Sequence, residues 1–159
     1  MKKIFLTASL FLTVIACFSQ EEKNGIIYIK HPYIDIVNKS NKAYLEKDAA
    51  TNSKIFADTA RFWVSGMPKA IPISEAIKMW TADFDYYDSI NIKTVGYPDY
   101  LAYVDHDTKV VQSWGTWYGK SKKTGDKLRI DFVQFDDFNK DGKIQFESIY
   151  GDFSRMGKN

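Results

Sequence analysis

The chain has 159 residues, of which 22 are Lys or Arg, 20 are Asp or Glu and 16% are aromatic, which is typical of one domain with a real hydrophobic core. The charges nearly balance, and this argues against nucleic-acid binding because there is no basic excess to contact phosphates. Cys17 is the only cysteine and lies near the start, so the fold is expected to contain neither a disulfide nor a thiolate metal cluster.

The first residues predict an export signal. Lys2 and Lys3 precede an apolar run, Ile4 to Ala16, that has the length of a signal-peptide core and is short for a membrane span. Residues 1–16, or 1–19, are therefore predicted to be a signal peptide. We expect the protein to be exported, either secreted or held in the periplasm or cell envelope.

Two processing sites remain open. Val14 to Cys17 has the form of a bacterial lipobox, in which Cys17 becomes the lipidated first residue of the mature protein. Alternatively, Ser19 precedes a signal-peptidase cut at Gln20. A lipid on Cys17 would be the only contact with a membrane, because no other long apolar run follows.

The rest of the chain predicts a polar tether, residues 17–31, and a single domain, residues 32–156. Asp48 and Ser74 are expected N-caps, because their side-chain oxygens accept hydrogen bonds from free backbone N–H groups. The predicted helices cover residues 33–47, 49–57 and 74–85. The predicted strands cover residues 61–64, 90–95, 100–104, 109–119, 128–138 and 144–153. Helices followed by a meander of strands indicate the α+β class.

Three segments resemble the nuclear-transport-factor-2-like superfamily, in particular its SnoaL-like branch. They are KIFADTARFWVSG, the helix opened by Ser74 and Glu75, and the hairpin ending FDDFNKDGKIQFESIYGD. The resemblance spans roughly Tyr33 to Asp152. It implies a cone-like, strongly curved antiparallel sheet that packs against N-terminal helices and encloses a pocket, and it implies a homodimer.

The same superfamily contains ketosteroid isomerase, which uses an Asp base and an oxyanion hole of Tyr and protonated Asp. Matching the motifs places Val64 at the position of the base, Ser40 at that of the Tyr and Gln134 at that of the protonated acid. None of the three keeps its chemistry, although Tyr44 lies one helical turn from Ser40. That isomerase mechanism is therefore not expected here.

The strand over residues 128–138 supplies the first candidate pocket residues. Its even positions start with the more apolar residues, so we expect the even face to point into the interior. Gln134 and Asp136 then lie on a buried face, where each needs a partner or a ligand. Alternatively, a bulge near Phe135 turns Asp136 towards solvent.

Helices and the neighbouring strand supply four further candidates. Asn41 and Tyr44 share the inner stripe of the first helix, and Trp80 lies on the stripe of the third, where it is either core or a ligand contact. Trp114 and Trp117 are three positions apart and so lie on opposite faces of a regular strand. We expect Trp114 to point inward and Trp117 to point outward, because Gln112 and Trp114 lie at about the right register opposite Gln134 and Phe132.

No metal or cofactor is predicted. Asp137, Asn139, Asp141 and Gly142 follow the spacing of a calcium loop, but its twelfth position is Ser148 rather than Glu and its flanks alternate like strands, so a hairpin turn is expected. The run of residues 105–107, Asp-His-Asp, is expected to be a solvated turn.

The predicted function is that of an exported pocket domain that binds a small, largely apolar molecule without transforming it. The alternative is an enzyme of the cyclase, isomerase or dehydratase kind, with Asp136 as a weak candidate base and Tyr44 or Gln134 holding an oxyanion. A third alternative is an interaction module that dimerises through the outer face of the sheet.

Overall fold

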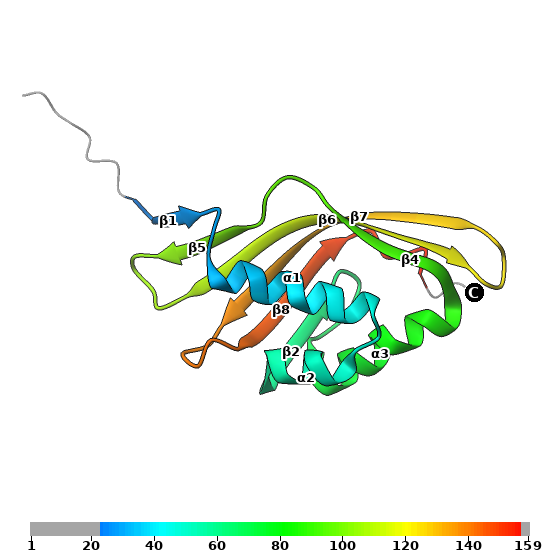
Figure 1. The fold of residues 1–159 in the computed structure, drawn as a ribbon, viewed down its shortest axis with the longest axis horizontal. Coiled ribbons are helices and arrows are strands. Elements are labelled where there is room, and N and C mark those ends of the chain that lie inside the picture. The colour runs from blue at the N-terminus through cyan, green and yellow to red at the C-terminus, as the bar shows by residue number, and fades with distance from the viewer. Residues whose placement is uncertain (1–22, 157–159) are drawn as a thin grey trace, which may run out of the picture.

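The computed structural model describes residues 23–156, so the predicted signal peptide, Cys17 and both processing sites lie outside the described residues (Figure 1). None of the helices in that range is long and apolar enough to cross a membrane. The helices are α1 (Pro32–Leu45), α2 (Ala49–Ile55) and α3 (Ile73–Tyr86). The strands are β1 (Gly25–Tyr28), β2 (Phe56–Val64), β3 (Ile71–Pro72), β4 (Tyr87–Thr94), β5 (Asp99–Tyr103), β6 (Lys109–Ser121), β7 (Lys127–Phe138) and β8 (Ile144–Gly151).

The strands form one open sheet in the order β1-β5-β6-β7-β8-β2-β3. The strand β6 pairs with β7 along one edge, and along the other edge it pairs first with β5 and then with β4. The predicted α+β class and curved sheet are confirmed. The sheet is mixed rather than wholly antiparallel, because β2 runs parallel to β8.

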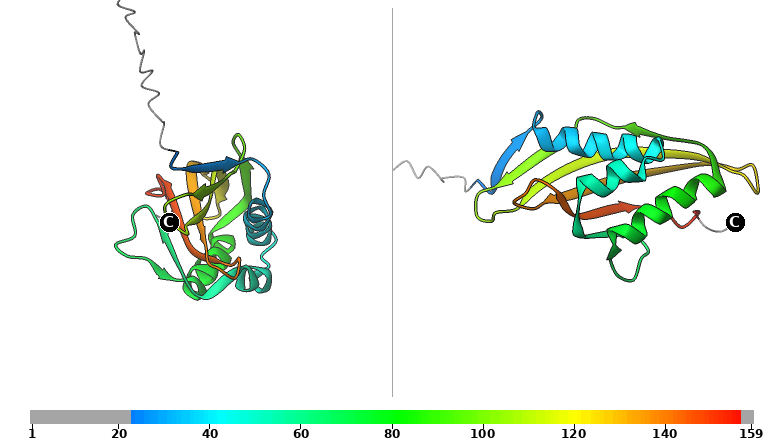
Figure 2. Two further views of the ribbon diagram at one scale, coloured as in Figure 1. Left: turned by 90° about the vertical axis from the view of Figure 1, so that its left-hand side faces the viewer. Right: turned by 60° about the horizontal axis from the view of Figure 1, so that its bottom comes forward.

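All three helices lie on one face of the sheet, as the two views of Figure 2 show. Helix α1 contacts β4, β5 and β6, while α3 contacts β2, β3 and β4. Between them α2 joins α1 to the first residues of β2. The helices therefore cover the concave side of the sheet, and the site described below lies in the space they enclose.

Local sequence explains where the helices begin. His31 caps α1 by accepting a hydrogen bond from the backbone N–H of Tyr33 (3.2 Å), and Pro32 occupies the first turn, where its missing N–H costs nothing. The Asp48 cap of α2 is confirmed, since its carboxylate accepts from the N–H of Thr51 (2.9 Å). The Ser74 cap is wrong, because α3 already begins at Ile73, after Pro72.

The predicted tether contains a strand. Residues Gly25–Tyr28 form β1, which pairs with β5, the next strand in the sheet, and places Ile27 opposite Leu101. Its side chains stay exposed: Ile26 and Ile27 are 53% and 64% accessible to solvent. The pairing therefore comes from backbone hydrogen bonds at a sheet edge, which the short apolar run did not predict.

The core is filled at one end of the sheet. There Val37 of α1 and Phe56 of β2 pack against Val111, Phe138 and Ile144, and all five are almost fully buried. A second, smaller cluster surrounds the buried Trp117 on β6. The cavity opens between these two clusters.

Candidate functional site

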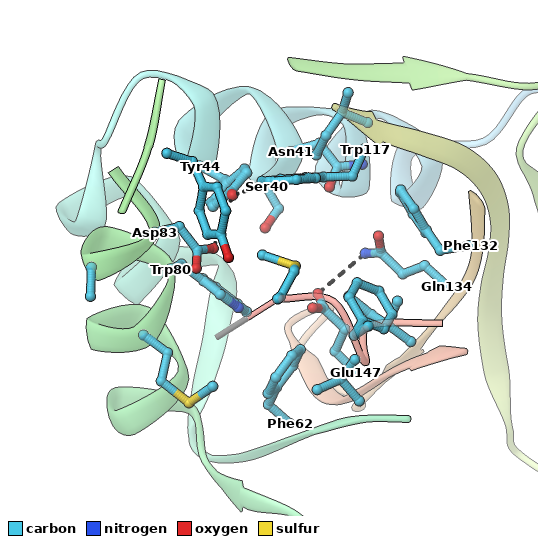
Figure 3. Close-up of a pocket in the computed structure, with 18 of the residues that line it drawn as sticks. Ser40, Asn41, Tyr44, Phe62, Trp80, Asp83, Trp117, Phe132, Gln134 and Glu147 are labelled. Atoms are coloured by element: carbon cyan, nitrogen blue, oxygen red, sulfur yellow. Dashed lines mark hydrogen bonds between the residues drawn. The ribbon is translucent and has the colours of Figure 1, made fainter. Parts of the chain in front are cut away.

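A cavity of about 570 Å³ lies between α1, α3 and the concave face of the sheet (Figure 3). Most of its wall is apolar, and it includes the aromatic side chains of Tyr44, Phe62, Trp80, Tyr86, Tyr87, Trp117, Phe132 and Phe153. Five polar residues interrupt this wall: Ser40, Asn41, Asp83, Gln134 and Glu147. A large apolar pocket with a few polar groups is the usual form of a small-molecule site.

The alternation of side chains along the strands determines which residues line the cavity. Phe132 and Gln134 of β7 face the cavity, as do Glu147 and Ile149 of β8. The inward even face predicted for β7 is confirmed, and no bulge turns Asp136 outward, since that residue is 0% exposed. The odd positions of β7 consequently face the other side of the sheet.

The inward position predicted for Trp114 is wrong, and Trp117 lines the cavity instead. The register of the hairpin explains the difference: Ser113 lies opposite Gln134, and Gly115 lies opposite Phe132. The odd residues of β6 therefore share a face with the even residues of β7. A shift of one residue moves every side chain of a strand to its other face.

Two glycines of β6 make room for the rings in this wall. A Cβ atom on Gly115 would lie 2.5 Å from Cζ of Phe132, and a Cβ atom on Gly119 would overlap the ring of Trp117. Each ring lies over a glycine, where the strand has no side chain. Glycine at these positions thus sets the shape of the cavity floor.

Two carboxyl groups and an amide form a buried polar cluster at the sheet side of the cavity. Gln134 Nε2 donates to Asp136 Oδ2 (2.9 Å) and to Glu147 Oε2 (3.2 Å). The pairing of β7 with β8 places Asp136 directly opposite Glu147. Glu147 lines the cavity, whereas Asp136 is enclosed next to it and does not.

Both acids of this cluster have raised pKa values. Burial raises the pKa of Asp136 to about 7. Burial, followed by the negative charge of Asp136, raises the pKa of Glu147 well above its usual range. The pair therefore retains a proton near neutral pH. Environments that hold a carboxylic acid neutral in this way are common at functional sites.

A second polar group lies at the helical side of the cavity. Tyr44 Oη donates to Asp83 Oδ2 (3.0 Å) and accepts from Trp117 Nε1 (3.0 Å). Burial raises the pKa of Asp83 to about 6, and the hydrogen bond from Tyr44 counteracts part of that rise. Burial and the nearby Asp83 also raise the pKa of Tyr44, so its hydroxyl stays protonated.

The structure brings four of the six predicted pocket residues together around one cavity: Asn41, Tyr44, Trp80 and Gln134. Their role as ligand contacts stays a prediction. Asp136 is too enclosed to meet a ligand directly, so the acid that can do so is Glu147. Sequence reasoning missed Glu147, Asp83 and Trp117. The period-two pattern of β8, in which Glu147 shares a face with Ile149, was the signal for the first of them.

The three positions matched to the isomerase machinery, Ser40, Val64 and Gln134, all line the cavity. Ser40 donates to Asn52 Oδ1 (3.0 Å), and Val64 has no proton to transfer. The acidic side chains that line this cavity are instead Glu147 on β8 and Asp83 on α3.

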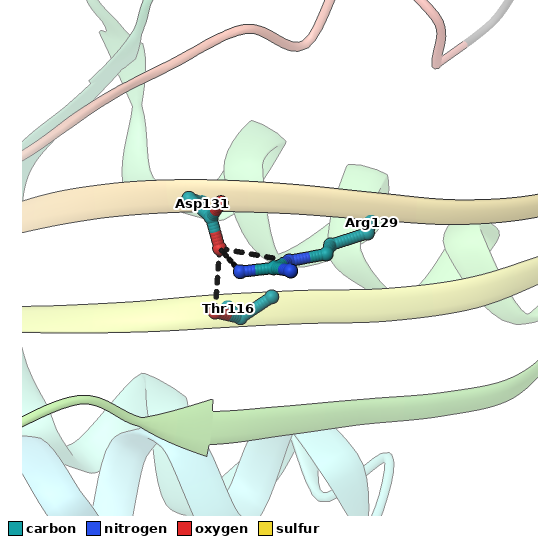
Figure 4. A network of polar contacts seen from close by, with 3 residues as sticks. All are labelled: Thr116, Arg129 and Asp131. Atoms are coloured by element: carbon teal, nitrogen blue, oxygen red, sulfur yellow. Dashed lines mark hydrogen bonds and ion pairs between the residues drawn. The ribbon is translucent and has the colours of Figure 1, made fainter.

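The opposite face of the sheet carries a different polar network (Figure 4). Asp131 Oδ1 accepts hydrogen bonds from Thr116 Oγ1 (2.6 Å) and from Arg129 Nε and a terminal guanidinium nitrogen (3.2 and 3.1 Å). These bonds hold the pKa of Asp131 below its usual range. Nearby, Tyr150 packs against Trp63 and Phe135 on the same face.

No protein-family model matches the sequence, and no curated protein matches it. Similar solved structures include IdmH from Streptomyces antibioticus, proposed to be a polyketide cyclase (13% identity, 77% of this chain and 93% of that chain, TM-score 0.63). Another is a proposed SnoaL-like polyketide cyclase from Shewanella denitrificans (13% identity, 80% and 95%, TM-score 0.60). A third is a protein of ketosteroid-isomerase-like fold from Catenulispora acidiphila in complex with trimethylamine (14% identity, 73% and 84%, TM-score 0.57). The chain therefore has the nuclear-transport-factor-2-like fold, shared with SnoaL-like and ketosteroid-isomerase-like proteins.

Proposed function

We propose that this protein is a pocket domain that binds a small, largely apolar molecule and orients it through Gln134 and Glu147. The observation that carries the proposal is the cavity of about 570 Å³, whose apolar wall is interrupted by this buried cluster. A few polar groups in an apolar wall fix the orientation of a ligand, while the wall supplies most of the affinity. The small molecule bound by the Catenulispora protein supports this use of the fold.

Filling the cavity tests the proposal. Val64 lines it, and Val64→Phe adds a ring to space that a ligand would otherwise occupy. The probe is N-phenyl-1-naphthylamine, an uncharged dye whose emission rises in apolar surroundings. We expect saturable binding of one dye per chain in the unmodified protein and loss of that binding in the variant.

The control makes the same substitution outside the cavity. Val95 is 51% exposed and does not line the cavity, so Val95→Phe should leave dye binding unchanged. Circular dichroism and unfolding curves check that both variants fold. No dye binding in the unmodified protein, or equal binding in the Val64→Phe variant, refutes the proposal.

An enzymatic function is the second candidate, because the carboxyl of Glu147 faces the cavity and burial raises its pKa well above the usual range. Such a group serves as a general acid or base in isomerase and cyclase chemistry. Glu147 takes the role earlier assigned to Asp136, which becomes its proton-sharing partner. A direct test is α-proton exchange of 2-tetralone in D₂O, followed by NMR. Glu147→Gln should abolish any acceleration, and no acceleration by the unmodified protein refutes this candidate.

Export to the cell envelope is part of the proposal. Its support is the pair of N-terminal lysines followed by a short apolar run and the lipobox ending at Cys17. If Cys17 is lipidated, Cys17→Ala should move the protein from the detergent phase to the aqueous phase. Mass spectrometry that finds a mature N-terminus at Gln20 would instead assign signal-peptidase cleavage.

We also propose a homodimer, with the outer face of the sheet as the contact surface. The aromatic cluster of Trp63, Phe135 and Tyr150 supports this surface, since Tyr150 is 48% exposed and apolar rings are enriched in interface cores. Sedimentation should give a dimer, and Tyr150→Lys should give a monomer that retains dye binding. A monomeric unmodified protein at high concentration would refute this part.

A further inference from the structure

Among residues 23–156, acidic side chains line the cavity and basic side chains do not. Asp83 and Glu147 line it and Asp136 lies next to Glu147, while no Lys, Arg or His of residues 23–156 is among the lining residues. None of the three acids forms an ion pair with a basic side chain in this part of the chain. The electrostatic field in the cavity therefore favours positive charge.

The sheet-side acids lack a full set of partners. Asp136 and Glu147 are 0% and 3% exposed, and Asp136 Oδ1 accepts no hydrogen bond from an N–H or hydroxyl donor in the described range. A proton shared with Glu147 satisfies part of this deficit, yet a singly protonated pair still carries one negative charge. Burying such a charge without a cation is unfavourable, so a positive group beside Glu147 would be strongly stabilised.

The apolar wall indicates which kind of cation fits. Phe62 and Trp80 contact each other edge to face (5.3 Å between ring centroids), and Phe132 and Trp117 line the sheet side. Aromatic rings attract organic cations through their negative faces. A hydrated metal ion would lose its water to such a wall, and residues 23–156 hold no group of three or more acidic, His or Cys side chains arranged to replace it.

We propose that the ligand is an organic cation, an amine with an apolar body, whose positive charge lies beside Glu147 and whose body contacts the aromatic wall. The inference rests on the proposed binding function and adds the chemical class of the ligand. The side chains that face Glu147 across the cavity include Tyr44 and Asp83, which carry no positive charge.

The test compares two probes of equal shape, benzyltrimethylammonium and its uncharged isostere neopentylbenzene, by calorimetry at pH 8. The cation has no N–H group, so a preference for it measures charge rather than hydrogen bonding. We expect the cation to bind the unmodified protein about tenfold or more tightly than the isostere. The double variant Asp136→Asn/Glu147→Gln, which removes the negative charge of the pair, should remove most of that preference and leave the affinity for neopentylbenzene within about twofold.

The control is Glu75→Gln, which removes a carboxyl at an exposed position of α3 and should keep the preference for the cation. Equal binding of the two probes by the unmodified protein refutes the inference and needs no variant. A preference for the cation that survives the double variant Asp136→Asn/Glu147→Gln also refutes it. If the uncharged dye binds while the cation shows no advantage, the binding function stands and only the ligand class is wrong; if neither dye nor probe binds, the binding function itself fails.

Discussion

Two aspartates of β7 show how differently the two faces of one sheet treat the same side chain. Asp131 lies on the outer face, exposed, next to Arg129 and Thr116, and its pKa is lowered. Asp136 lies on the inner face, enclosed, next to a second carboxyl, and its pKa rises to about 7. In the folded protein the outer network favours the ionised form of Asp131, whereas the inner cluster disfavours the ionised form of Asp136. Clusters that oppose their own charge in this way are frequent at functional sites.

The largest expected effect comes from removing the inner charge. A raised folded pKa means that the folded state binds more protons than the unfolded state between about pH 4 and pH 7, so stability falls as the pH rises through that window. Asp136→Asn keeps an acceptor for Gln134 and removes the loss of stability that ionisation of Asp136 causes. We expect the free energy of unfolding at pH 8 to increase by on the order of 3 kcal/mol, with little change at pH 4.

Urea unfolding at both pH values measures this effect. A loss of stability at pH 8 would contradict it and would mean that the charged form of Asp136 is favoured by a partner in the folded state. The Asp131→Asn protein, measured beside it, provides the outer-face reference.

The next-largest effect is expected from a substitution that fills space, rather than one that changes charge, on the inner face of the sheet. Gly119→Ala places a methyl group where the ring of Trp117 lies, so the ring must move into the cavity. We expect a loss of about 1–3 kcal/mol in unfolding free energy and weaker dye binding. Lys120→Ala, at the exposed next residue, is the control that should change neither. An unchanged dye affinity in the Gly119→Ala protein would show that Trp117 does not shape the ligand site.

The smallest effect is expected on the outer face. A lowered folded pKa gives a contribution that is present above the unfolded pKa and lost as the pH falls through the folded pKa, which is opposite in sign to that of Asp136. Asp131→Asn should therefore lower the melting temperature slightly at pH 7, and 1 M NaCl should reduce the difference. Thermal unfolding at two salt concentrations checks this. A clear stabilisation by Asp131→Asn would remove the contrast between the two faces.

Local patterns predicted what local chemistry controls. The cap at Asp48, the three helices and the inward face of β7 all follow from spacing within one segment. The parallel pairing of β2 with β8 joins segments far apart in the chain, where no turn restricts the direction, and nothing in either strand specifies it.

The error at Trp114 has a single physical source. The loop between Lys120 and Lys127 sets those two residues opposite each other, and this fixes Ser113 rather than Gln112 against Gln134. The predicted register differed by one residue and therefore exchanged the two tryptophans. The period-two pattern of β8 indicates that Glu147 points inward, but its raised pKa comes from burial and from Asp136 on the neighbouring strand, which the sequence of β8 alone does not show.

The division of tryptophans between the two faces gives the protein a built-in optical reporter. Of the four tryptophans, Trp80 and Trp117 line the cavity, while Trp63 and Trp114 lie on the outer side of the strand alternation. A ligand in the cavity should alter the emission of the first pair, and a partner on the sheet should alter that of the second. Replacing either pair by Phe would leave a protein whose remaining intrinsic fluorescence reports on one face alone.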